Sequence, residues 1–147
     1  MSRLRAVTLT QPWATALVRG VKTIETRSWS TRYEGWFAVH AAKGWTLADR
    51  EFALEDAWRY LQMYPEDYPR ACIVGVAHLV KCVPADKVEP GEADELFGFF
   101  GPERFAWIVD QARELRAPIP CRGAQGWWPV PADVEAEMRK QFGMVPA

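Results

Sequence analysis

The chain has 147 residues, of which 49% are hydrophobic and 25% are charged, and its formal net charge at pH 7 is −1. This composition is that of one globular domain and excludes a chain that is disordered throughout. The near-neutral charge argues against a domain that holds long nucleic acids by charge alone, because such domains are usually strongly basic.

Cysteine usage and the start of the chain bear on metals and compartment. The three cysteines are odd in number and show no CxxC spacing, which argues against a disulfide framework and against a metal site. The first residues lack the apolar stretch of a signal peptide, and no segment approaches a membrane span. We therefore expect a cytoplasmic domain with no cofactor, no metal and no membrane association.

A strand and a short helix are expected first. Residues 5–10 alternate weakly between apolar and polar and predict a strand. In the following segment Thr10 is suited to cap a helix and Gly20 to end it. The apolar face of this helix comes from residues spaced at i, i+3 and i+4, namely Trp13, Ala16 and Leu17.

Residues 22–29 predict the next strand and carry several charges. Alternation along a strand places Glu25 and Arg27 on one face and Lys22 on the other. Beyond it, patterning predicts strands at 36–41, 71–83 and 105–109, helices at 46–64 and 132–142, an acidic loop at 84–104 and an irregular segment at 118–129. These elements predict a single α+β, mainly β domain over residues 1–147, built as a small mixed β-barrel with helices packed on it.

The charged residues of this second strand are suited to bind a nucleotide. Lys22 carries a compact charge that can meet a phosphate or polarise a carbonyl. Glu25 can accept a hydrogen bond from a base amino group, and Arg27 can bind phosphate with two parallel hydrogen bonds. A fold-stabilising ion pair between Glu25 and Arg27 is the structural alternative.

Other polar and aromatic residues are candidates for the same cleft. We expect His40 and Lys43 to converge there from the next strand, and Gln125, which lies in a Gly-rich stretch, to contact a base edge. Trp13 and Trp128 are candidates for stacking on a base. His40 as a half-buried histidine and Trp13 as a core residue are equally compatible with the sequence.

The pattern Gly20-x-Lys22-x-x-Glu25-x-Arg27, preceded by Leu9-Thr10-Gln11-Pro12 and a short helix, resembles the signature of the ASCH domain, a branch of the PUA-like superfamily. The resemblance covers nearly the whole chain and is to the bacterial and phage type. It implies a PUA-like mixed barrel with a cleft between the barrel and the first helix. It also implies binding of RNA or a nucleotide, including a modified nucleoside.

Two other functions remain open. Some small ASCH proteins are amidohydrolases that act on acylated cytidine through a Lys and a Thr, and others have been linked to RNA cleavage. Here Glu25 occupies the position of that Thr, so the expected hydrolase would use Lys22 and Glu25 as catalytic residues, with Glu25 activating water. The third reading is a protein-interaction module that docks through exposed Trp residues and the acidic segment 86–103.

Overall fold

Six strands form one mixed sheet in the computed structural model, which describes residues 3–143. The order across the sheet is β2-β5-β4-β3-β1-β6; β1 runs parallel to β3, and the other neighbouring strands are antiparallel. The strands are β1 (Arg5–Leu9), β2 (Ile24–Arg27), β3 (Gly35–Ala41), β4 (Cys72–Pro84), β5 (Phe105–Pro120) and β6 (Trp128–Pro129).

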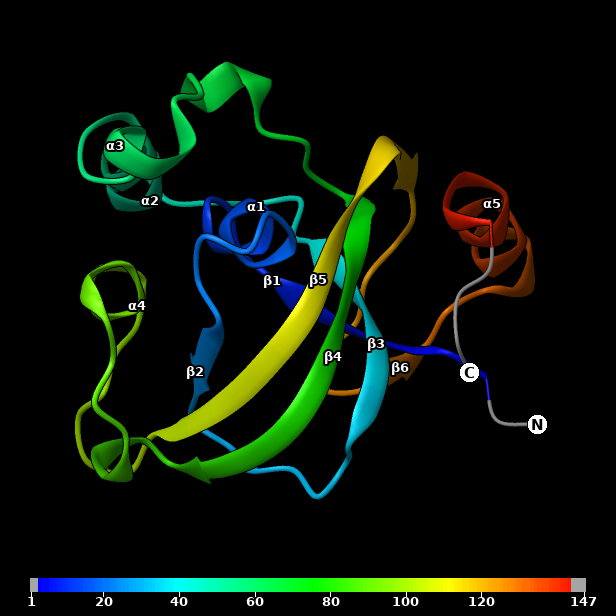
Figure 1. The fold of residues 1–147 in the computed structure, drawn as a ribbon. Coiled ribbons are helices and arrows are strands. Elements are labelled where there is room, and N and C mark those ends of the chain that lie inside the picture. Colours follow the sequence, from blue (N-terminus) through cyan, green and yellow to red (C-terminus); the bar gives the residue numbers. More distant parts are fainter. Residues whose placement is uncertain (1–2, 144–147) are drawn as a thin grey trace.

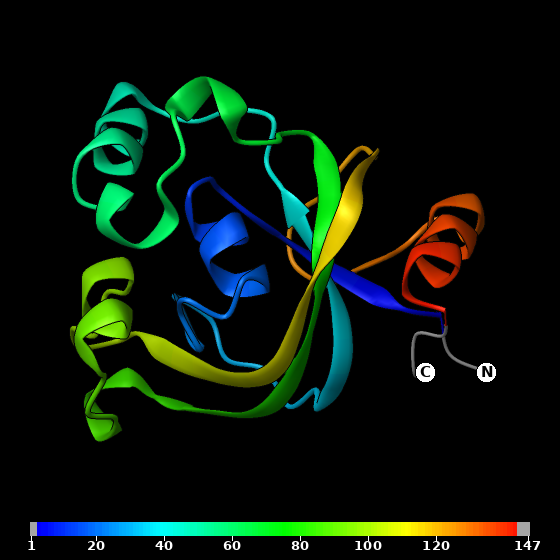
Figure 2. The same ribbon diagram turned by 45° about the horizontal axis from the view of Figure 1, so that its top comes forward.

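Helices cover both faces of this sheet (Figure 1). They are α1 (Trp13–Val18), α2 (Leu47–Leu54), α3 (Trp58–Leu61), α4 (Glu92–Phe97) and α5 (Ala132–Phe142), with two short 3-10 turns at Pro65–Asp67 and Ala85–Lys87. The long strands β4 and β5 curve around α1, whereas α5 lies on the far side of the sheet (Figures 1 and 2).

Each face of the sheet has its own hydrophobic core, as the alternation along β1 shows. Val7 points to the face of α1 and belongs to one cluster with Leu17. Ala6 points the other way and belongs to a second cluster with Met138 of α5. The period-2 pattern of a strand covered on both sides therefore fixes where α1 and α5 pack.

The helix α1 lies unusually close to the sheet. A Cβ atom at Gly75 of β4 would come within 2.7 Å of Val18 Cγ1 and 2.3 Å of the Arg113 carbonyl oxygen. Only a glycine permits this approach, which holds α1 against the middle of β4 and β5. A third cluster then joins α1 to α2, α3 and α4, through residues such as Ala16, Ala57 and Phe97.

The predicted α+β class with helices packed on the strands is confirmed, but the predicted barrel is wrong because the sheet is open. Its two edges are β2 and β6, and they do not pair with each other. Both are short, with four and two residues, so neither offers enough backbone to close the sheet. The gap between these two edges is on the same side of the sheet as α1.

Three expected elements differ in extent. The helix predicted over 46–64 is two helices, because the chain turns out of helical geometry at Glu55 (ψ −81°) before α3. The strand predicted at 105–109 continues to Pro120, pairing with β4 through three register shifts. The predicted acidic loop contains α4.

The start of α1 also departs from the prediction, since no side chain caps it and Thr10 is not the N-cap residue. The N-cap residue is Pro12, and Gln11 before it holds the first turn of the helix with its side chain. Its Oε1 accepts a hydrogen bond from the Thr15 backbone N–H at 3.0 Å, and its Nε2 donates to the Pro69 carbonyl at 2.8 Å. At the other end Gly20 follows the helix with φ +74°, as predicted for a helix stop.

Candidate functional site

Lys22, Glu25 and Arg27 meet where α1 leads into β2. Lys22 Nζ forms an ion pair with Glu25 Oε1, and Arg27 Nη1 lies 3.1 Å from Glu25 Oε2. The left-handed backbone at Gly20 turns the chain so that the Lys22 N–H donates to the Ala16 carbonyl at 3.2 Å. The carboxylate is therefore bound on both oxygens, one by each cation.

The strand parity predicted for Lys22 is wrong. Lys22 precedes β2, which begins at Ile24, so the alternation of a strand does not govern its direction and its side chain reaches the Glu25 face. Lys22 is 1% exposed and Glu25 is 8% exposed. The Arg27 side chain is 22% exposed, so of the three it is the most open to solvent.

The charges of this cluster do not cancel. Two cations surround one carboxylate, which leaves one positive charge beside the surface. Arg27 Nη1 also donates to the Thr8 carbonyl oxygen at 3.5 Å, whereas the buried Arg27 Nε has no hydrogen-bond partner among the described residues. A partly exposed guanidinium with uncompensated charge is suited to bind an anion such as phosphate.

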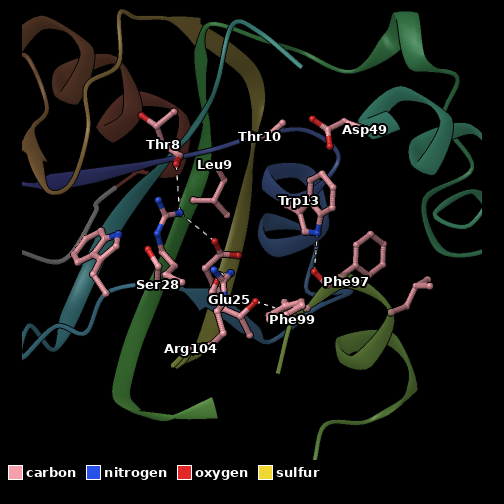
Figure 3. Close-up of a pocket in the computed structure, with 15 residues that line it drawn as sticks. Thr8, Leu9, Thr10, Trp13, Glu25, Ser28, Asp49, Phe97, Phe99 and Arg104 are labelled. Atoms are coloured by element: carbon pink, nitrogen blue, oxygen red, sulfur yellow. Dashed lines mark hydrogen bonds and ion pairs between the residues drawn. The ribbon is translucent and has the colours of Figure 1, made fainter. Parts of the chain in front are cut away.

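A hollow of about 430 Å³ opens beside this cluster, between α1, β2 and the segment that follows α4 (Figure 3). Glu25 and Arg27 line it, but Lys22 does not. Trp13 forms part of its wall: the indole N–H donates to the Phe97 carbonyl at 2.6 Å, and the ring stacks on Phe52 at 5.2 Å between centroids. One face of Trp13 is therefore already covered.

Among the lining residues that the sequence did not indicate as site residues are Trp29, Phe99 and Arg104. Arg104 Nη2 donates to the Thr26 carbonyl at 3.1 Å, and its guanidinium lies 5.2 Å from the Phe99 ring centre. Phe99 is 61% exposed. For Phe99 and Arg104, the signal in the sequence is a run of aromatic residues and one arginine at the end of an otherwise acidic segment.

His40, Lys43 and Gln125 do not reach Glu25. They line a second hollow of about 780 Å³, beside the segment of residues 121–125. His40 is 2% exposed, and its Nε2 lies 2.7 Å from the Cys121 carbonyl. Because a carbonyl only accepts, Nε2 carries the proton, which leaves Nδ1 as the partner of Thr8 Oγ1 at 3.1 Å.

The environment of His40 disfavours its charged form. Burial lowers the pKa of the imidazole, and the hydrogen bond to the Cys121 carbonyl opposes part of that effect. Gly123 packs directly on the ring, since a Cβ there would come within 2.7 Å of His40 Nδ1. A neutral histidine that is packed this tightly serves to position the segment of residues 121–125.

Trp128 does not serve as a stacking surface, contrary to the sequence-based expectation. It is 8% exposed and lines none of the hollows described here. Its indole N–H donates to Thr8 Oγ1 at 3.2 Å, and its ring lies edge-on to His40. Its neighbour Trp127 is stacked on Trp107 at 5.3 Å, so both indoles belong to the packing that supports β1.

Within residues 3–143, no cluster of three or more His, Cys, Asp and Glu side chains could hold a metal ion. None of the helices there is long and apolar enough to cross a membrane.

Comparison with known proteins identifies the family. The ASCH domain model matches residues 7–141. The chain belongs to the ASCH family. ASCH domains are PUA-like and are generally RNA-binding.

Two curated relatives of the domain are the activating signal cointegrator 1 proteins of Homo sapiens and Mus musculus. They are 29% and 28% identical over 136 and 135 residues, which is 88% of this chain in each case. The match spans 23% of either relative. It therefore concerns one domain of a longer protein.

The fold agrees with solved ASCH structures. The crystal structure of ASCH from Zymomonas mobilis has a TM-score of 0.57, with 14% identity over 94% of both chains. A mutant form of that protein has the same TM-score, with 13% identity over 95% of this chain and 98% of the other. At such low identity the likeness concerns the fold alone.

The buried ion pair predicts a large cost for losing its lysine. We expect Lys22→Met, which keeps the aliphatic stem, to lower the free energy of unfolding by about 3–5 kcal/mol, because it removes one partner of a buried carboxylate. The matched control Arg19→Met breaks a half-exposed pair with Glu114 and should cost less than about 1 kcal/mol. Urea denaturation measures both, and equal losses would contradict the assignment.

The lowered pKa of His40 predicts a pH-dependent stability. Because the unfolded chain binds this proton more readily, with a pKa of about 6.5, acid favours unfolding. The stability present above pH 6.5 is lost as the pH falls toward the lower folded pKa. Thermal melts from pH 7.5 to 5 should show a steeper fall in Tm for the parent than for His40→Gln. An equal fall in Tm with pH for the parent and His40→Gln would refute the assignment of this pH dependence to His40.

Proposed function

We propose that this domain binds RNA and holds one nucleotide in the hollow beside Glu25 and Arg27. The observation that carries the proposal is the uncompensated charge of Arg27. Lys22 occupies one oxygen of Glu25 and so leaves positive charge on the Arg27 guanidinium, whose side chain is 22% exposed. Arg104 brings a second guanidinium to the same hollow. A phosphate between these two arginines is the ligand that this arrangement favours.

The hollow also offers apolar surface to a base. Its volume of about 430 Å³ lies within the range of small-molecule sites, roughly 300–1,000 Å³. Phe99 is mostly exposed at its rim, and Trp29 is half-buried in its wall. Stacking on such rings contributes roughly 1–3 kcal/mol per base and tolerates any base. The pairing of guanidinium with aromatic side chains therefore supports a nucleotide over a simple anion.

Binding is better supported than hydrolysis. A general base needs a free oxygen that reaches water and substrate, but each oxygen of Glu25 already bonds a cation. An oxyanion stabiliser must touch the substrate, but Lys22 is enclosed behind Glu25. In our proposal Lys22 and Glu25 therefore position Arg27 instead of carrying out a reaction.

A protein-docking role has less support. It relied on exposed Trp residues, but all eight are buried or half-buried. The acidic segment contains α4, where Glu92 pairs with Arg59 of α3 and Asp94 accepts from the backbone N–H of Thr23 at 2.7 Å. In our interpretation its carboxylates hold α4 beside the hollow.

Removal of Arg104 tests the proposal. We expect Arg104→Ala to weaken binding of a fluorescein-labelled nine-residue oligouridine about tenfold, since it deletes one phosphate contact worth about 1.4 kcal/mol. Fluorescence anisotropy measures the affinity. The control Arg59→Ala deletes an equally charged, exposed arginine outside the hollow and should bind like the parent.

The same samples separate a binder from an enzyme. Mass analysis after incubation with the oligouridine and with acylated cytidine should show no product. Turnover of either substrate that disappears in Glu25→Gln would overturn the non-catalytic assignment. Identical affinities for the parent, Arg104→Ala and Arg59→Ala would refute the placement of the RNA.

A further inference from the structure

The hollow beside Arg27 is not isolated. A connecting hollow of about 390 Å³ shares Arg27 and Trp29 with it, and shares Gln125 with the hollow beside His40. Thr8 of β1 lines all three. The three hollows therefore form one track that crosses the end of β1, which we call the β1 track.

The charge changes along the β1 track. Glu25 and Asp49 are its acidic lining residues, and both lie in the first hollow. The connecting hollow and the hollow beside His40 have no acidic lining residue. Lys43 and Arg122 line the far end, and neither takes part in the ion pairs found among residues 3–143. That end of the track is therefore basic.

The wall of the far end is held in place. His40 Nε2 donates to the Cys121 carbonyl at 2.7 Å. Thr8 Oγ1, whose proton His40 Nδ1 accepts, lies 3.3 Å from the Ala124 carbonyl oxygen. Gly123 lies so close to His40 that no side chain fits between them. The segment of residues 121–125 is thus fixed to β1 and β3 at several points, which gives the track a shape that exists before any ligand arrives.

We propose that the ligand is a single-stranded polynucleotide whose successive nucleotides follow the β1 track, with Lys43 and Arg122 contacting its phosphates. This inference rests on the proposed binding of one nucleotide in the first hollow. A mononucleotide would leave the basic end unused. A duplex would keep its bases stacked and so would not place one in the first hollow, whereas a single strand presents unstacked bases and an accessible backbone.

The test compares ligands of different length. Uridine monophosphate, oligouridines of three, five and nine residues, oligothymidine of nine residues and a nine-base-pair RNA duplex are titrated against the full chain. The test variant is Lys43→Ala/Arg122→Ala. The control Lys140→Ala/Arg116→Ala removes the same charges from exposed positions on α5 and β5 that line none of the hollows.

We expect the affinity of the parent to rise with length and the duplex to bind more weakly than the single strand. The test variant should lose about twentyfold in affinity for the nonamer at 0.1 M salt, and its log–log salt slope should fall by about 1.4, as two lost phosphate contacts require. Its affinity for uridine monophosphate should match that of the parent. The control should behave like the parent throughout.

Other outcomes separate the two proposals. Parent-like nonamer binding by the test variant, together with weaker binding by Arg104→Ala, would overturn the β1 track and leave the first hollow in place. Parent-like binding by both variants would overturn both proposals. A duplex that binds as tightly as the single strand would also overturn the track. Binding of either the oligouridine or the oligothymidine nonamer supports the track. The ratio of their two affinities shows whether the domain prefers RNA or DNA.

Discussion

The site depends on a buried carboxylate that two cations share. Lys22 reaches Glu25 from the link after α1, and Arg27 reaches it from the end of β2. Burying a charge without a partner is costly, so the first contact supports the fold while the second orients a guanidinium at the surface. Because two positive charges face one negative charge, part of the attraction of Arg27 remains for a ligand. One cluster therefore both supports the fold and orients Arg27 toward a ligand.

The open sheet gives this cluster its surroundings. A closed barrel would pair β2 with the opposite edge, whereas here the two edges remain apart and α1 packs between the curved strands (Figure 2). The end of β1 consequently stays accessible, with hollows on both sides of Thr8. The segment after α4 closes one side and brings Arg104 and Phe99 to the first hollow.

The sequence predicted the α+β class, and it identified Lys22, Glu25 and Arg27 as candidates, because a glycine-punctuated helix and a short charged strand are local patterns. The sequence-based prediction failed where contacts between segments distant in the sequence determine the structure. The length of β5 comes from its partner β4, and Arg104 is brought in by the segment after α4, a helix that the sequence predicts as part of a loop. The direction of Lys22 depended on where β2 begins, and the burial of Trp128 depended on β1 and His40. Strand parity and aromatic composition carry none of this information.

A crystal structure of the domain with a five-residue oligouridine would test the central claim most directly. The account predicts a phosphate within hydrogen-bond distance of both Arg27 and Arg104, a base against Phe99, and an intact bond between Lys22 and Glu25. RNA bound on the face of α5, or a phosphate that contacts Lys22 after the Glu25 pair has opened, would contradict it.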